Sequence, residues 1–151
     1  MFIFKKTKFI LLTTIDKLYH IKNLFILGKS DGELHENEIN IISQIAKKQN
    51  LTALELSLIL NEETNIPFIL PESFITRLSM LYDSVLLMVS DFKIHQNEKL
   101  ICIDLAKKFE FNPQIIDRLI DDILKYIIEG KECNEVIEYL TKYAHPKETL
   151  N

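Results

Sequence analysis

The apolar residues of this chain recur at intervals of three and four, which is the spacing of one face of an α-helix. The clearest stretch begins after Pro71, a residue that suits the first turn of a helix. Its apolar positions are Phe74, Leu78, Leu81, Val85 and Met88. No stretch shows convincing strand alternation, and only three glycines and four prolines interrupt the chain. The pattern predicts an all-α protein, a single compact bundle of about seven helices joined by short turns.

A second pattern repeats after sixty residues, because KSDGELHENE at 29–38 is followed by VSDFKIHQNE at 89–98. Nine of 31 positions are identical between 30–60 and 90–120, and leucines and isoleucines also align before them. This predicts one domain over 1–151 that contains two pseudo-symmetric copies of a unit made of helix, acidic turn, helix and short helix. Repeat one spans about 18–60, repeat two about 78–120, and a C-terminal helix about 132–144 follows Gly130.

The repeat also predicts local features of the helices. Thr52 and Glu55 have the spacing of a capping box, and Asn112-Pro113 places a cap and a first-turn proline at the matching point. Each second helix has matching core positions: Ile42, Ile45, Ala46 and Gln49 in one copy, Cys102, Leu105, Ala106 and Phe109 in the other. The pairs Lys47-Lys48 and Lys107-Lys108 suit helix C-termini, where the dipole favours cations.

The repeated acidic turn has a structural interpretation and a chemical one. If His35 is the cap of the second helix, Glu38 is its third residue and its carboxylate can accept a hydrogen bond from the backbone N–H of the cap. Asp31-Gly32 then forms an ordinary tight turn. Caps contribute about 0.5 to 2 kcal/mol, which is enough to explain both copies without a ligand.

The chemical interpretation is a divalent cation, calcium or magnesium, held by the carboxylates of the turns. Its ligands would be Asp31 and Glu38 in the first copy and Asp91 and Glu98 in the second, with Glu33, Glu36, His35 and His95 as weaker candidates. An EF-hand is not expected, because its first ligand positions would fall on leucine, lysine and valine. The first turn is the better candidate, since Phe92 and Lys93 replace glycine and an acid in the second.

Composition limits the function further. A formal net charge of −4 and a pI near 5.6 do not provide the basic surface that nucleic acids require. Cys102 and Cys133 form no metal-binding or disulfide pattern, which fits a reducing cytoplasm. No apolar run is long enough to cross a bilayer. Phenylalanines and lysines alternate near the start, however, and this N-terminal segment allows peripheral contact with a membrane: Phe2, Phe4, Lys5, Lys6, Lys8 and Phe9.

The stretch LFILGKSDGELHENEINIISQIAKKQNL at 24–51 resembles the TerB-type tellurite-resistance family, which includes the TerB-like domain at the start of DjlA-type co-chaperones. The resemblance covers about 18–128. It implies a helical fold with two pseudo-symmetric halves and a role in bacterial stress or metal-oxyanion resistance without enzymatic turnover. It also implies divalent metal binding through acidic residues, and a scaffold that binds partners near the inner membrane. Asp31, Gly32 and Glu38 match the first motif, and Asp91 and Glu98 match the second. No His-Pro-Asp triplet of a J-domain is present.

The sequence therefore predicts a cytoplasmic, non-enzymatic scaffold or stress-response module that binds a protein partner and a divalent cation, with contact at the inner face of the membrane. One alternative is a purely structural protein–protein interaction domain without a metal. Another is a metal-dependent enzyme, which requires His35, Glu38, His95 and Glu98 to meet in one cavity. No nucleophile with a base partner and no glycine-rich phosphate loop is found, so we expect no catalysis. His20 and His145 are expected at the surface or at helix ends.

Overall fold

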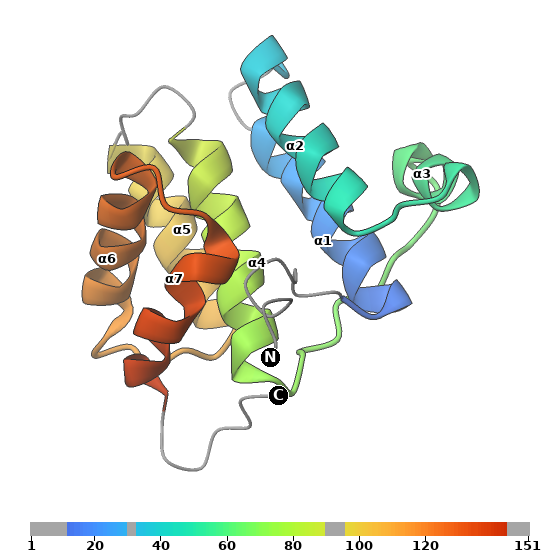
Figure 1. The fold of residues 1–151 in the computed structure, drawn as a ribbon. Helices are drawn as coiled ribbons and strands as arrows, with labels where there is room; N and C mark the ends of the chain where they lie inside the picture. The colour runs from blue at the N-terminus through green and yellow to red at the C-terminus, as the bar shows by residue number, and fades with distance from the viewer. Residues whose placement is uncertain (1–11, 30–32, 90–95, 145–151) are drawn as a thin grey trace, which may run out of the picture. The chain divides into compact units, whose positions relative to one another are not determined.

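The computed structural model describes residues 12–29, 33–89 and 96–144. Within these residues the chain forms seven α-helices and one short 3₁₀-helix, with no strand, which confirms the all-α prediction (Figure 1). The helices are α1 (Thr14–Gly28), α2 (Glu36–Lys48), α3 (Ala53–Leu60), α4 (Phe74–Met88), α5 (Gln96–Lys108), α6 (Ile116–Ile128), α7 (Cys133–Leu140) and η2 (Thr141–Tyr143).

The helices belong to two compact units. One unit spans Leu11–Ile69 and contains α1, α2 and α3, and in it α1 packs against both other helices. The other contains α4 to α7 with η2, and in it α4 packs against α5, α6 and α7. The boundary between Ile69 and Leu70 lies between the two predicted repeats, and the single-domain prediction stays a prediction.

The first unit is organised around α1, whose N-terminus is capped by the hydroxyl oxygen of Thr13. The buried side chains of α1 recur at helical spacing and belong to Leu18, Ile21, Leu24 and Leu27. His20 is also buried, at 1% exposure, so the expectation of a surface residue is wrong. His20 lies outside the apolar pattern of α1. The packing nevertheless covers a wider part of the helix surface than the apolar residues alone indicate.

The second unit is organised around α4, and 11 of its 15 residues are buried. Arg77 lies in this core, where its guanidinium donates a hydrogen bond to the carbonyl oxygen of Phe109 at the end of α5 (3.1 Å). The guanidinium carbon lies 5.6 and 5.7 Å from the ring centres of Phe74 and Phe111. The charged side chain therefore joins α4 to the residues that follow α5 through one hydrogen bond to Phe109 and one cation–π contact with Phe111, while its contact with Phe74 lies within α4.

Helix boundaries in the two units differ by sixty residues. α1 and α4 each have 15 residues and α2 and α5 each have 13, with both bounds displaced by sixty. Both second helices end with a residue at positive φ, Asn50 at 55° and Glu110 at 60°. The next residues, Leu51 and Phe111, donate hydrogen bonds to the carbonyl oxygens of Ala46 and Ala106, both at 3.1 Å. The third helices differ, because α3 has eight residues and α6 has 13.

Two predicted helix starts need correction. α4 begins at Phe74 and its cap is Ser73, whose hydroxyl oxygen accepts from the Thr76 N–H at 3.3 Å, so Pro71 precedes the helix. α6 begins at Ile116, and the side chain of Asn112 caps only a preceding turn by accepting from the Gln114 N–H. In both places the proline precedes the helix proper, and Pro113 lies in a turn. The last predicted helix is present as α7 followed by η2, after Gly130 at a φ of 79°.

Candidate functional site

The first residues of α2 form the predicted cap. Glu38 is the third residue of the helix, and its Oε1 accepts a hydrogen bond from the backbone N–H of His35 at 2.9 Å. The side chain of Glu38 is only 9% exposed. The capping interpretation is therefore confirmed for this residue, and one carboxylate oxygen of the predicted metal site is engaged by the backbone.

Leu34, the hydrophobic residue of the same motif, packs against the end of α1. Gly28 ends α1, and a Cβ atom at this position would lie 2.4 Å from Cδ1 of Leu34 and 3.8 Å from Cδ1 of Ile42. A side chain at residue 28 would thus collide with Leu34. Glycine at this position lets the residues before α2 lie against the end of α1, and this packing explains part of the motif without a ligand.

The other predicted ligands fall into three groups. Glu33, His35 and Glu36 are exposed near the start of α2. Glu98 is half-buried and is the third residue of α5, as Glu38 is of α2. Asp31, Asp91 and His95 lie outside the described residues, as do the N-terminal segment proposed for membrane contact and His145.

The described residues contain no cluster of three or more His, Cys, Asp or Glu side chains suited to a metal ion. His35 and Glu38 belong to the unit of α1–α3, whereas Glu98 belongs to the unit of α4–α7. The calcium or magnesium site and the four-residue enzyme site both stay predictions, because each requires residues outside the described parts of the chain.

Another candidate site lies on α3. Four of its leucines are exposed, and we call them the α3 leucine surface: Leu54 at 71%, Leu56 at 38%, Leu58 at 38% and Leu60 at 57%. Ile59 is the one residue of this helix that is fully inside, at 3% exposure. Several exposed leucines on one short helix mark an interaction site more often than a single exposed leucine does.

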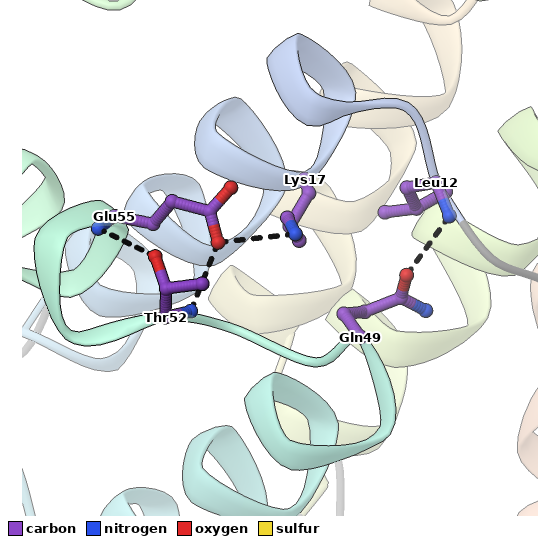
Figure 2. Close-up of polar contacts among 5 residues, drawn as sticks. All are labelled: Leu12, Lys17, Gln49, Thr52 and Glu55. Carbon is purple, nitrogen blue, oxygen red and sulfur yellow. Dashed lines mark hydrogen bonds and ion pairs between the residues drawn. The ribbon is translucent and has the colours of Figure 1, made fainter.

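The N-terminal end of α3 is held by polar contacts (Figure 2). The backbone N–H of Thr52 donates to Oε1 of Glu55 at 2.9 Å, and the N–H of Glu55 donates to the Thr52 hydroxyl oxygen at 3.1 Å, which confirms the predicted capping box. Lys17 of α1 reaches the same Oε1 at 3.1 Å. The Thr52 N–H, followed by Lys17, holds the pKa of the Glu55 carboxyl below its ordinary value.

Further contacts tie α3 to its neighbours. The backbone N–H of Leu12 donates to Oε1 of the buried Gln49 at 2.9 Å, next to the start of α3 (Figure 2). At the other end, Nζ of Lys22 donates to the carbonyl oxygens of Asn61 at 3.4 Å and Thr64 at 2.7 Å. Lys17 at its start and Lys22 beyond its end thus hold α3 against α1, so its exposed leucines belong to an ordered helix rather than to a frayed one.

Sequence reasoning missed the α3 leucine surface, although a signal was present. The helix reads ALELSLIL, with apolar residues on almost every side, and an eight-residue helix packed on one side leaves the other side in water.

Cys102, by contrast, is buried as predicted, and burial raises the pKa of its thiol to about 12. The Cys102 thiol, buried and neutral, is not a nucleophile at physiological pH.

Comparison of the chain with protein-family models, with curated proteins and with solved structures found no match. None of the described helices is long and apolar enough to cross a membrane.

Proposed function

We propose that this chain is a TerB-like, non-enzymatic binding module that docks a protein partner through the α3 leucine surface. The observation that carries the proposal is the exposure of Leu54 and Leu60, at 71% and 57%, on a helix whose two ends are held against α1 by Lys17 and Lys22. Burying a fully exposed leucine contributes about 1.5 to 3 kcal/mol, so covering these side chains would supply a substantial part of a binding free energy.

The polar groups of α3 favour burial against a partner. Glu55 is bonded to Thr52 and Lys17, and the Ser57 hydroxyl donates to the carbonyl oxygen of Leu54 at 2.7 Å. A partner that covers the helix therefore leaves few polar side chains unsatisfied. A catalytic site would instead gather titratable groups in a cavity.

The TerB-like part of the proposal rests on the repeat. Equal helix lengths, helix boundaries displaced by sixty residues and the same C-terminal turn at Asn50 and Glu110 support two pseudo-symmetric copies, about 18–60 and 78–120. Matching buried positions, such as Ile42 with Cys102 and Ile45 with Leu105, would give a common framework, and the third helices, α3 and α6, differ most in length. A specific binding surface is expected where a duplicated framework has diverged.

The test is affinity capture from a lysate of the protein's own cells with the wild type and two double variants. Wild type should retain a partner that Leu54→Ser combined with Leu60→Ser loses by about tenfold or more. The matched control is Leu100→Ser combined with Ile128→Ser, which removes two other exposed apolar side chains, at 49% and 58%, from α5 and α6. Equal capture by all three proteins, with unchanged circular dichroism, would refute the proposal.

A further inference from the structure

The exposed leucines of α3 lie on two sides of the helix. With about 100° between successive residues, Ser57 points almost directly away from the buried Ile59. Leu54 and Leu60 then lie about 60° to either side of Ser57, and Leu58 and Leu56 lie about 100° to either side. The exposed fractions follow this order, since Leu54 and Leu60 are at 71% and 57% whereas Leu56 and Leu58 are both at 38%.

This arrangement constrains the shape of whatever covers the helix. A flat surface that touches Ser57 can reach Leu54 and Leu60, but Leu56 and Leu58 face away from it. Covering all four leucines requires a surface that wraps around more than half of the helix circumference. A groove has this shape, and helices docked in apolar grooves are a recurrent mode of protein recognition.

We infer that α3 is a ligand helix that inserts into an apolar groove on another protein, so that the leucines on both sides of Ser57 contact opposite walls. This inference rests on the proposed function and adds the shape and chemistry of the partner. A symmetric dimer through α3 is a poor alternative, because two convex helices cannot enclose each other. Ser57 faces outward and would be buried at the floor of the groove. Its hydroxyl already donates a hydrogen bond to the carbonyl oxygen of Leu54, so its burial leaves no unsatisfied donor.

The charges around α3 assign a sign to the rim of the groove. The stretch 49–69 contains no lysine or arginine, and its acidic residues are Glu55, Glu62 and Glu63. Glu55 pairs with Lys17. Glu62 and Glu63 are exposed just beyond the end of the helix, where the ammonium of Lys22 is bonded to carbonyl oxygens, and the two carboxylates outnumber this single cation. The partner should therefore carry basic residues where its groove meets this end of α3.

Site-specific photo-crosslinking tests the groove. A diazirine-bearing amino acid replaces one residue at a time: Leu54, Leu56, Leu58 or Leu60. All four probes should crosslink to the same partner protein, with Leu54 and Leu58 reaching one wall and Leu56 and Leu60 the other. Crosslinks from one side only would overturn the groove while leaving the proposed function intact. Crosslinks to a second copy of this chain would overturn the assigned partner.

Charge-reversal variants in the affinity-capture assay test the proposed basic rim. Glu62→Lys combined with Glu63→Lys should lower capture by about tenfold, an effect that weakens at high salt. The control is Glu129→Lys combined with Glu138→Lys, which makes the same change of net charge at two exposed positions of the other unit and should leave capture unchanged. Equal loss with both pairs would overturn the basic rim. If capture is absent or does not depend on the α3 leucines, the proposed function fails as well.

Discussion

At the scale of single residues, the acidic motif is a packing and capping device in its described part. Gly28 lacks the side chain that would collide with Leu34, and Glu38 bonds the backbone of the helix cap. Both contacts explain why particular residue types occur where they do. Neither requires a cation, and both are open to measurement.

The contact between Gly28 and Leu34 predicts a coupling between two substitutions. Alanine is favoured over glycine inside a helix by about 1 kcal/mol, but in the wild type Gly28→Ala also forces Leu34 to move. We expect Gly28→Ala to raise the free energy of unfolding by about 1 kcal/mol in a Leu34→Ala background and to give little or no gain in the wild type. Urea denaturation of the four proteins measures this coupling. Equal effects of Gly28→Ala in both backgrounds would contradict it.

Glu38 allows the cap and the cation to be separated. Glu38→Ala should lower the free energy of unfolding by about 1 kcal/mol, because the His35 N–H loses its acceptor, and Glu38→Gln should lose less because its amide oxygen can still accept. Thermal melts in EDTA measure both effects.

The same melts with calcium, magnesium or manganese test the cation hypothesis. A bound cation raises Tm by mass action, and Asp31→Asn combined with Glu38→Gln should abolish that rise. If no divalent cation raises Tm and the double variant only melts earlier, the cap is the whole role of Glu38.

At the scale of elements, α3 depends on a titrating cap. The pKa of Glu55 is lowered in the folded chain, first by the Thr52 N–H and then by Lys17. A carboxyl with a lowered folded pKa stabilises the fold above its ordinary pKa, and this stabilisation is lost as the pH falls through the folded value. The cap of α3 should therefore weaken in acid, while a hydroxyl cap should not.

This predicts a pH-dependent effect of Glu55→Gln. The variant should be less stable than wild type at pH 7, and the difference should shrink as the pH falls below the ordinary value of 4.5. The control is Ser73→Ala, which removes a cap without an ionisable group and should cost about 1 kcal/mol at every pH. Urea denaturation between pH 7 and pH 3 measures both variants. A Glu55→Gln effect that does not change with pH would contradict the assignment.

The elements also mark how far the sequence could predict the structure. The apolar spacing of α4 and the capping box of α3 are local signals, and both were found because neighbouring residues determine them. The burial of His20 and the exposure of Leu54 could not be found, since they depend on which faces the packing covers. For the candidate site, Glu38 could be assigned to a cap from its spacing alone. The other predicted ligands, Asp31 and Asp91, lie outside the described residues, so the structure does not test the predicted cation site.

At the scale of the whole molecule, the chain contains two compact units of unequal size. Among the described residues, three α-helices belong to the unit that carries the α3 leucine surface, and four α-helices with η2 belong to the unit built around α4. α7 has no counterpart in the smaller unit, and it packs against α4 through Val136, Ile137 and Leu140, which are buried. The larger unit thus has one more α-helix among the described residues than the smaller unit, and the additional buried side chains increase its stability.

The difference between the units predicts different behaviour when they are expressed separately. Residues 70–151 should fold alone, because α5, α6 and α7 all pack on α4 and most of that helix is buried. Residues 11–69 should be less stable, since three helices bury fewer side chains, and should aggregate through the α3 leucines. Circular dichroism melts and light scattering measure these properties, and Leu54→Ser combined with Leu60→Ser should reduce aggregation of the smaller fragment. If residues 70–151 show no cooperative melt, the two units are not independent in stability.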